Sequence, residues 1–303
     1  HDIDLTPITD LLDNWQVYPS TSPHEVAERI INATVVLSNK IPLNGKTAVG
    51  ADKLQYISVM ATGTNNVDLD WAKLKGIPVS NALAYATPSV VQHTISLILA
   101  LSNNLPAYIT DVRSGRWQDS NVFCLLDHPI QEVAGKQLGI IGYGELGSSV
   151  AKAAAGLGLD IKISERPGIK PRADRVAFEE LLATSDYISL HCPLTENNKH
   201  LINADTLMLM KPTAFLINTA RGGLVDSPAL LSALRDGRIA GAAIDVLDVE
   251  PAASDEPLIT SLQNLLVTPH NAWGAIESRT RLVAQMKENI EGFLQGLPLR
   301  VVN

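Results

Sequence analysis

The segment that most restricts the fold of this chain is residues 137–147, which read QLGIIGYGELG. The mostly apolar residues 138–141 are typical of a fully buried parallel strand. Gly142, Gly144 and Gly147 then form a G-x-G-x-x-G pattern at the start of an alanine-rich helix. In such a turn the first glycine permits a tight bend, the second lets the backbone approach a pyrophosphate, and the third allows close helix–strand packing. The segment predicts a dinucleotide site, although an ordinary strand-to-helix turn can show the same spacing.

An acidic residue at the end of the next predicted strand supports this interpretation. The strand covers 159–164, and Glu165 follows it, 18 residues after Gly147. At a spacing of about 20 residues, a carboxylate in this fold hydrogen-bonds the ribose hydroxyls of NAD. Arg166 comes next, and its guanidinium could instead bind the 2′-phosphate of NADP. Because Glu165 would repel that phosphate, we expect NAD to be preferred, with NADP as the alternative.

Strand and helix patterns alternate through the rest of the chain. Further strands are predicted at 187–190, 214–218, 240–246 and 265–267, with helical stretches such as 178–182 and 228–234 between them. Together with the two strands described above they make six, as a doubly wound parallel sheet requires.

The first part of the chain predicts a smaller α/β domain with its own parallel sheet. Its expected strands are 34–37, 56–60 and 77–79, and its expected helices are 24–31 and 69–75. This sheet lacks a last helix, so the helical pattern at 276–294 is expected to return to it. We therefore expect a substrate domain of residues 1–101 plus 276–303 and a cofactor domain of residues 102–275.

Between the two predicted sheets lies a helical stretch, 87–103, that is apolar on nearly every side. A helix of this kind is buried, here between two domains or two subunits. His93 lies within it and is expected to be a hydrogen-bonded core histidine. Residues 105–132 are interpreted as a helix followed by a long arm, and a long arm in a compact domain is usually functional or part of an interface.

Composition limits the partners of this 303-residue chain. Its formal net charge of −8 argues against nucleic-acid or membrane-surface binding, which depends on basic patches. The sequence has no run of about 18 apolar residues that could cross a membrane, and no signal segment is expected. Two cysteines are too few for a disulfide framework, which favours the cytoplasm. No metal site is expected.

Three predicted strand ends carry a cation, a carboxylate and an imidazole. They are Arg221 in NTARGG, Glu250 in DVLDVEP and His270 in TPHNAWG. A guanidinium can hold a keto acid by two parallel bonds and polarise its carbonyl group. An imidazole can protonate the carbonyl oxygen as hydride reaches the carbon, and a neighbouring carboxylate stabilises the imidazolium and fixes its tautomer. Together these groups suit hydride transfer to a 2-keto acid, although each residue alone could be structural.

The sequence resembles the NAD(P)-dependent D-isomer-specific 2-hydroxyacid dehydrogenases over nearly its whole length. The most specific motifs are GYGELG at 142–147, NTARGGLVD at 218–226 and PHNAW at 269–273. The resemblance implies two Rossmann-like domains, with a doubly wound cofactor domain inserted in a split, flavodoxin-like substrate domain. It also implies that Arg221 orients the substrate, that His270 is the acid/base, and that Glu250 is its carboxylate partner.

The resemblance carries over to further positions. The backbone of Ala61, Thr62 and Gly63 resembles the family's loop for the substrate carboxylate, where the family often has glycine in place of Ala61. Asp245 resembles the residue that contacts the nicotinamide amide. The cofactor-binding residues expected in this way are Gly142, Gly144, Glu145, Leu146, Gly147, Glu165, Arg166, His191, Pro193, Thr195, Thr219, Ala220, Asp245 and Gly274. A homodimer formed through the central helices is also implied.

Within the family, residues 81–93 and 123–130 are most similar to glycerate dehydrogenases, also called hydroxypyruvate reductases. We therefore expect reduction of a small anionic 2-keto acid, hydroxypyruvate or glyoxylate, to D-glycerate or glycolate. A formate dehydrogenase is disfavoured because its histidine is characteristically paired with an amide, whereas Glu250 is a carboxylate. A short phosphoglycerate dehydrogenase and a non-enzymatic NAD-sensing corepressor remain open alternatives.

Overall fold

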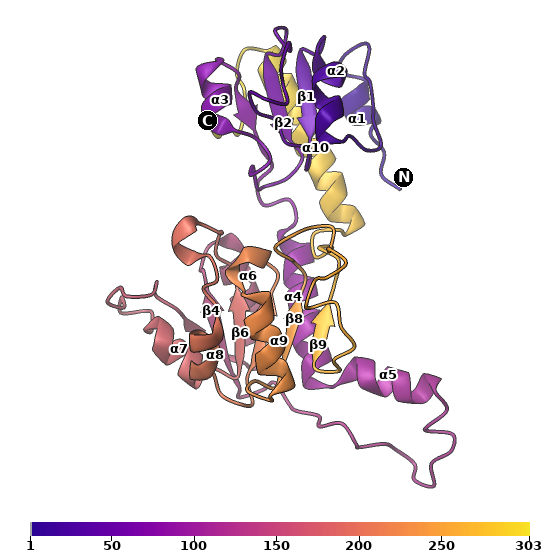
Figure 1. The fold of residues 1–303 in the computed structure, drawn as a ribbon, viewed down its shortest axis with the longest axis vertical. Coiled ribbons are helices and arrows are strands. Elements are labelled where there is room, and N and C mark those ends of the chain that lie inside the picture. Colours follow the sequence, from indigo (N-terminus) through magenta and orange to yellow (C-terminus); the bar gives the residue numbers. More distant parts are fainter. Residues whose placement is uncertain (1) are drawn as a thin grey trace. The chain divides into compact units, whose positions relative to one another are not determined.

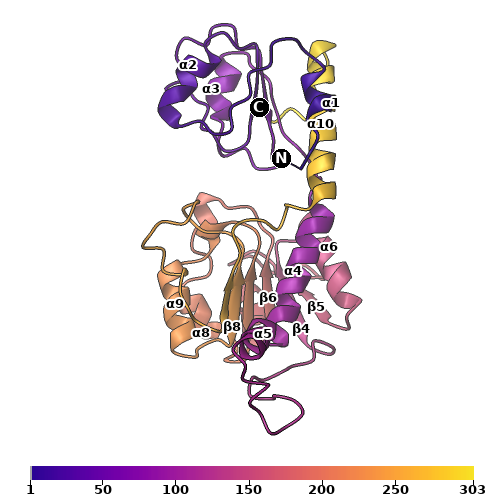
Figure 2. The same ribbon diagram turned by 90° about the vertical axis from the view of Figure 1, so that its right-hand side faces the viewer.

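The computed structural model describes residues 2–303, which form two compact units (Figures 1 and 2). The first contains the chain up to Ala86 together with Gly274–Asn303, and the second is Thr87–Trp273. Each unit has its own parallel sheet, which confirms the predicted α/β fold with two parallel sheets.

The first unit is built on three parallel strands in the order β1-β2-β3. The strands are β1 (Val35–Ser38), β2 (Tyr56–Val59) and β3 (Val79–Ser80), and the short helices are α1 (Thr6–Thr9), η1 (Pro23–Glu25), α2 (Val26–Ile30) and α3 (Leu69–Leu74). The long helix α10 (Ile276–Leu294) packs on this sheet. The ring of Phe293 stacks on that of Tyr56 with their centroids 4.5 Å apart, and Met286 and Ile290 are fully buried. The two ends of the chain therefore share one hydrophobic core.

The second unit is a six-stranded parallel sheet with the order β5-β4-β6-β7-β8-β9. Its strands are β4 (Gln137–Ile141), β5 (Asp160–Ile163), β6 (Tyr187–Leu190), β7 (Phe215–Asn218), β8 (Gly241–Ile244) and β9 (Leu265–Val267). The order reverses between β4 and β6, because the chain moves outward from β4 to β5 and then returns to the other side. In open α/β sheets this switch point is where ligands bind, at the carboxyl ends of the strands.

Helices cover both faces of this sheet, as Figure 2 shows. One face carries α4 (Thr87–Ser102) and α6 (Glu145–Ala155), and the other carries α7 (Phe178–Thr184), α8 (Ala204–Leu209) and α9 (Ser227–Arg235). Two separate sets of buried apolar side chains fill the layers, for example Ile98 with Val150 on one face and Leu181 with Leu230 on the other. Strands that are buried on both faces explain the continuous apolar runs in the sequence.

The apolar helix α4 belongs to the second unit. It packs against α6, β7 and β8, and its Leu97, Ile98 and Leu101 lie in the same core as Ile140. The division of the chain therefore falls at Ala86, whereas the sequence pattern placed the boundary at 101. An all-round apolar pattern signals burial, but it does not say against which sheet the helix is buried.

After α4 the chain forms α5 (Leu105–Arg113) and then an irregular arm that reaches β4. In Figure 1 the arm runs away from the sheet before it returns. Four elements were not predicted from the sequence: α1, α8, and the 3₁₀ turns η2 (Glu196–Asn198) and η3 (Gly222–Leu224). Each is short, so its hydrophobic periodicity covers too few residues to be recognised.

Candidate active site

The turn between β4 and α6 places its three glycines in different surroundings. Gly142 has a φ of +93°, and a Cβ there would lie 2.5 Å from the backbone nitrogen of Cys192. A Cβ on Gly147 would lie 2.0 Å from the carbonyl oxygen of Gly142. These two glycines are required by the packing of the protein itself.

A Cβ on Gly144, in contrast, would meet no protein atom within 4 Å. Its lack of a side chain therefore has no explanation in packing, but it leaves open the path by which a pyrophosphate would approach the backbone. The first-turn amides of α6, which include those of Glu145 and Leu146, have no intrahelical acceptors and suit an anion. These residues fit a dinucleotide.

Glu145 introduces a negative charge at this helix start. Its Oε1 accepts a hydrogen bond of 2.7 Å from Thr87 Oγ1 at the start of α4. The partial positive charge at the N-terminus of a helix stabilises a nearby carboxylate. The same positive charge would attract a phosphate, so Glu145 and a bound phosphate would compete for it.

Glu165 lies two residues after β5 and is buried, with 5% of its surface exposed. Its Oε2 accepts a bond of 2.7 Å from Arg172 Nε, and its Oε1 accepts one of 3.0 Å from Arg172 Nη2 and one of 3.1 Å from the amide of Arg166. The hydrogen bond from Arg172 is the main reason that the pKa of Glu165 is lowered to about 2. The carboxylate that was expected to repel a 2′-phosphate is thus already paired with a cation, and this weakens the reason for preferring NAD.

His191, at the end of β6, is buried and neutral. Burial lowers the pKa of its imidazole to about 4, and its ring Nε2 lies 2.8 Å from Ser189 Oγ. The amide of His191 also donates to the carbonyl of Ile141. His191 therefore holds the end of β4 by this hydrogen bond, and its backbone packs directly against Gly142. Pro193 and Thr195 follow in the same loop, and Thr195 is exposed and caps η2 together with Asn198.

Arg221 lies in the loop after β7. Asn218 fastens this loop, because its side chain accepts from the amide of Ala220 and donates to the carbonyl of Arg221. Arg221 itself gives one guanidinium bond to the carbonyl of Ala220, and its other donors have no acceptor within residues 2–303. Thr219 is buried, with its Oγ1 lying 3.0 Å from Thr94 Oγ1 on α4.

The glycines after Arg221 bring its loop against the loop after β8. A Cβ on Gly222 would lie 1.9 Å from the carbonyl carbon of Leu247. Only glycine permits this approach of two backbones. The R-G-G sequence therefore places Arg221 beside the segment that leads to Glu250.

Glu250 and His270 form the pair that the sequence suggested. His270 Nδ1 lies 2.6 Å from Glu250 Oε2, while Glu250 Oε1 accepts from the amide of Leu247. Roughly a quarter of each side chain is exposed. Because an ionised carboxylate only accepts, the proton of the imidazole lies on Nδ1, which leaves Nε2 for a ligand.

Asp245, at the end of β8, organises the loop that carries His270. Its carboxylate accepts from the amides of Asn271 and Ala272, each at 3.0 Å, and from Thr268 Oγ1 at 2.5 Å. Its carbonyl oxygen accepts from the amide of His270 at 2.7 Å. The side chain is 1% exposed, with one lone pair of Oδ2 left for a ligand donor.

The remaining predicted residues lie in the first unit. Ala61, Thr62 and Gly63 follow β2, and within residues 2–303 their amides have no protein acceptor. Asn81 holds this loop by donating to the carbonyl of Thr62 at 2.8 Å. Gly274, the first residue of the returning segment, accepts from Arg279 Nε.

Sequence reasoning missed four residues that support these loops: Asn81, Arg172, Asn218 and Thr268. Asn218 stands in the NTARGG motif and could have been recognised as a turn-forming side chain. The others depend on contacts between distant segments. Among the described residues no three side chains are grouped as a metal ion would need. Nor does any helix described here combine the length and apolar character needed to cross a bilayer.

Comparisons with known proteins agree with this geometry. Residues 95–272 match the family model described as "D-isomer specific 2-hydroxyacid dehydrogenase, NAD binding domain". A putative 2-hydroxyacid dehydrogenase of Haemophilus influenzae is 41% identical over 93% of this chain and 91% of that protein. A glycerate dehydrogenase of Methylorubrum extorquens is 43% identical over 95% of this chain and 91% of its own length. The crystal structure of TT0316 protein from Thermus thermophilus has a TM-score of 0.85 at 32% identity, covering 95% of this chain and 91% of that one.

A doubly wound sheet, a glycine turn that fits a pyrophosphate and an imidazole–carboxylate pair together define a nicotinamide-dependent oxidoreductase. More narrowly, the chain belongs to the D-isomer specific 2-hydroxyacid dehydrogenase family.

Proposed function

We propose that this enzyme uses a reduced nicotinamide cofactor to convert hydroxypyruvate or glyoxylate into D-glycerate or glycolate, with His270 as the acid/base. The observation that carries the proposal is the 2.6 Å contact between His270 Nδ1 and Glu250 Oε2. It directs Nε2 toward a ligand and stabilises the imidazolium, which is the form that donates the proton during reduction and the form that is regenerated when the reverse reaction removes a proton. The glycerate dehydrogenase relative supports the choice of substrate.

Each residue has a defined part in this reaction. The bound nicotinamide supplies the hydride. Arg221 holds the keto acid and polarises its carbonyl group through the guanidinium donors that are not used by Ala220. His270 Nε2 delivers the proton to the carbonyl oxygen, and Glu250 keeps the ring in the required tautomer. The amides of Ala61, Thr62 and Gly63 are proposed to bind the substrate carboxylate.

The proposal includes both forms of the cofactor. For NAD, Glu165 Oε2 accepts one bond from Arg172 and keeps a lone pair for a ribose hydroxyl. For NADP, the segment after β5 offers Arg166 and Arg172, and both side chains are exposed.

We expect Arg172→Gln to weaken NADPH binding by about tenfold, as for loss of one charge-assisted contact, while NADH binding changes less than threefold. Calorimetric titration of both cofactors measures this. Equal weakening of NADH and NADPH would contradict it.

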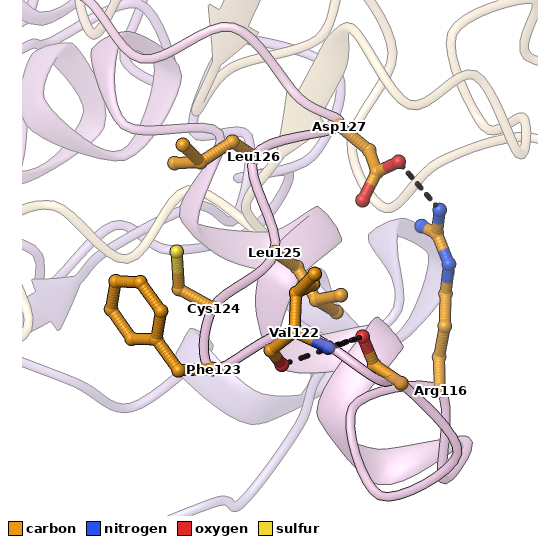
Figure 3. A pocket seen from close by; sticks show the side chains of 8 residues that line it. Arg116, Val122, Phe123, Cys124, Leu125, Leu126 and Asp127 are labelled. Atoms are coloured by element: carbon orange, nitrogen blue, oxygen red, sulfur yellow. Dashed lines mark hydrogen bonds and ion pairs between the residues drawn. The ribbon is translucent and has the colours of Figure 1, made fainter.

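A second copy of the chain is the proposed partner. Apolar side chains of the arm are exposed, with Phe123 at 90% and Leu126 at 75%. Figure 3 shows Phe123, Cys124, Leu125 and Leu126 lining a pocket, together with the ion pair between Arg116 and Asp127. The pocket has a volume of about 740 Å³. Exposed apolar patches of this kind mark interaction sites. Light scattering of Phe123→Ser should show a loss of dimer relative to the unsubstituted protein.

The cytoplasm, where both free thiols remain reduced, is the proposed compartment.

The experiment that tests the function is a panel of hydroxypyruvate, glyoxylate, pyruvate and phosphohydroxypyruvate, each assayed with NADH and NADPH. We expect the highest kcat/KM with hydroxypyruvate or glyoxylate. A preference for phosphohydroxypyruvate would favour a phosphoglycerate dehydrogenase instead. Binding of cofactor without turnover of any of these acids would favour the sensing role.

A further inference from the structure

Helix α4 is hydrogen-bonded to the loops that carry the site. Ser89 Oγ donates to the carbonyl of Ala272 at 2.6 Å, and Thr94 Oγ1 lies 3.0 Å from Thr219 Oγ1. Between them, His93 Nε2 lies 3.1 Å from Thr268 Oγ1 and 3.5 Å from Asp245 Oδ1. The His93 side chain is 23% exposed, so its contacts are largely shielded from water.

The direction of these bonds follows from the number of protons. Thr268 has one hydroxyl proton, and it donates that proton to Asp245 Oδ1 at 2.5 Å. The hydroxyl oxygen can therefore only accept from His93, so His93 carries a proton on Nε2. The result is a directed chain from His93 through Thr268 to the Asp245 carboxylate. A chain of this kind polarises each successive bond and fixes the rotamer of the hydroxyl group in the middle.

The far end of the chain holds the loop of the acid/base. Asp245 accepts from the amides of Asn271 and Ala272, which flank His270 on its carboxyl side. The backbone of His270 itself has a φ of +51°, a left-handed conformation that non-glycine residues rarely adopt. Such a conformation persists only where the surrounding contacts enforce it.

We propose that His93 is a positioning residue that acts through Thr268 and Asp245 to hold residues 268–272, and with them His270, in the conformation needed for proton transfer. It contacts neither the reacting atoms nor the hydrogen-bonding groups of His270. The catalytic part of this inference rests on the proposed function, whereas the structural part does not.

Hydrogen exchange of the unliganded protein tests the structural part directly. In His93→Leu the Thr268 hydroxyl loses its donor, so peptides covering 268–273 should exchange about three- to tenfold faster, the range for one lost hydrogen bond. His93→Gln, whose amide can donate to Thr268, should restore most of the protection. Thr268→Val should match His93→Leu, and the double variant should be no worse than Thr268→Val alone, because both act on one chain. Gln92→Leu, an exposed change on the same helix, is the matched control.

Kinetics test the catalytic part. His93→Leu should lower kcat by about three- to tenfold. The KM of the keto acid and the calorimetric affinity for NADH should change by no more than about twofold. The deuterium isotope effect on kcat should rise, because hydride and proton transfer become slower. Unchanged exchange of 268–273 in His93→Leu overturns the inference whatever the enzyme does. Faster exchange with an unchanged kcat overturns the catalytic part. Absence of turnover in the unsubstituted protein contradicts the proposed function, while the exchange result still decides the structural part.

Discussion

The turn after β4 and the loop after β9 both carry residues of the candidate site, but they are held in different ways. The turn is defined by close backbone contacts at its glycines, since a Cβ on Gly147 would meet the carbonyl oxygen of Gly142 and a Cβ on Gly142 would meet the backbone of Cys192. The loop is defined by side chains from elsewhere, with Asp245 from β8 and His93 from α4 holding the segment around His270. Conformation encoded locally can be recognised in a sequence, whereas conformation imposed by distant partners requires the structure.

The largest effect is expected at His270. His270→Asn should lower kcat by about a hundredfold or more, as for loss of a general acid, while the affinity for NADH stays nearly the same. Asparagine is chosen because it tolerates the left-handed backbone. His200 has the same φ of +51° in the second unit, so His200→Asn is the control and should keep full turnover. Full turnover of His270→Asn would rule out its role.

Two substitutions in the glycine turn should affect different quantities, one the stability of the fold and the other the affinity for the cofactor. Gly142→Ala places a Cβ at a left-handed φ and against the Cys192 backbone, so we expect a loss of several kcal/mol in the free energy of unfolding. Gly144→Ala faces open space, so its stability should stay within about 0.5 kcal/mol while NADH affinity falls about tenfold or more. Urea unfolding and calorimetric titration measure the two quantities. Equal loss of stability in both variants would contradict the assignment of Gly144 to the ligand.

His191 should make the second unit sensitive to acid. Its pKa is about 4 in the folded protein against 6.5 for an ordinary histidine, so between these values the unfolded chain binds a proton that the folded chain does not. Stability contributed by the neutral ring is complete above pH 6.5 and is lost as the pH falls toward 4, by about 3 kcal/mol in all. His191→Gln should remove this part of the acid dependence in urea unfolding from pH 7 to 4. An identical pH dependence in the variant would show that other groups cause it.

The smallest effect is expected at Glu145. Glu145→Gln keeps an acceptor for Thr87 but removes a charge from the helix start where a phosphate would bind. We expect cofactor affinity to rise about two- to threefold at low salt, and less at high salt, because the interaction is exposed and screened. Weaker binding in the variant would contradict this. Thr87→Val, which removes the donor and keeps the charge, is the comparison.

The same contrast explains how much could be predicted from the sequence. The six strands of the second sheet and the glycine turn were recognisable because hydrophobic runs and glycine spacing are local patterns. The family was recognisable from motifs such as PHNAW. The partner of Glu165 was not, because Arg172 reaches it from an irregular loop, and neither was the division at Ala86, which depends on where α4 packs. The roles of Arg221, Glu250 and His270 remain predictions that the variants above test.

The open space beside Gly144 implies a particular evolutionary record. Gly142 and Gly147 are retained by the fold, since a side chain at either would collide with the backbone. Gly144 is free of that constraint and would be retained only while a cofactor is bound there. In descendants of this chain that no longer use a nucleotide, substitutions should therefore accumulate at Gly144 first, while its two neighbours persist as traces of the ancestral site.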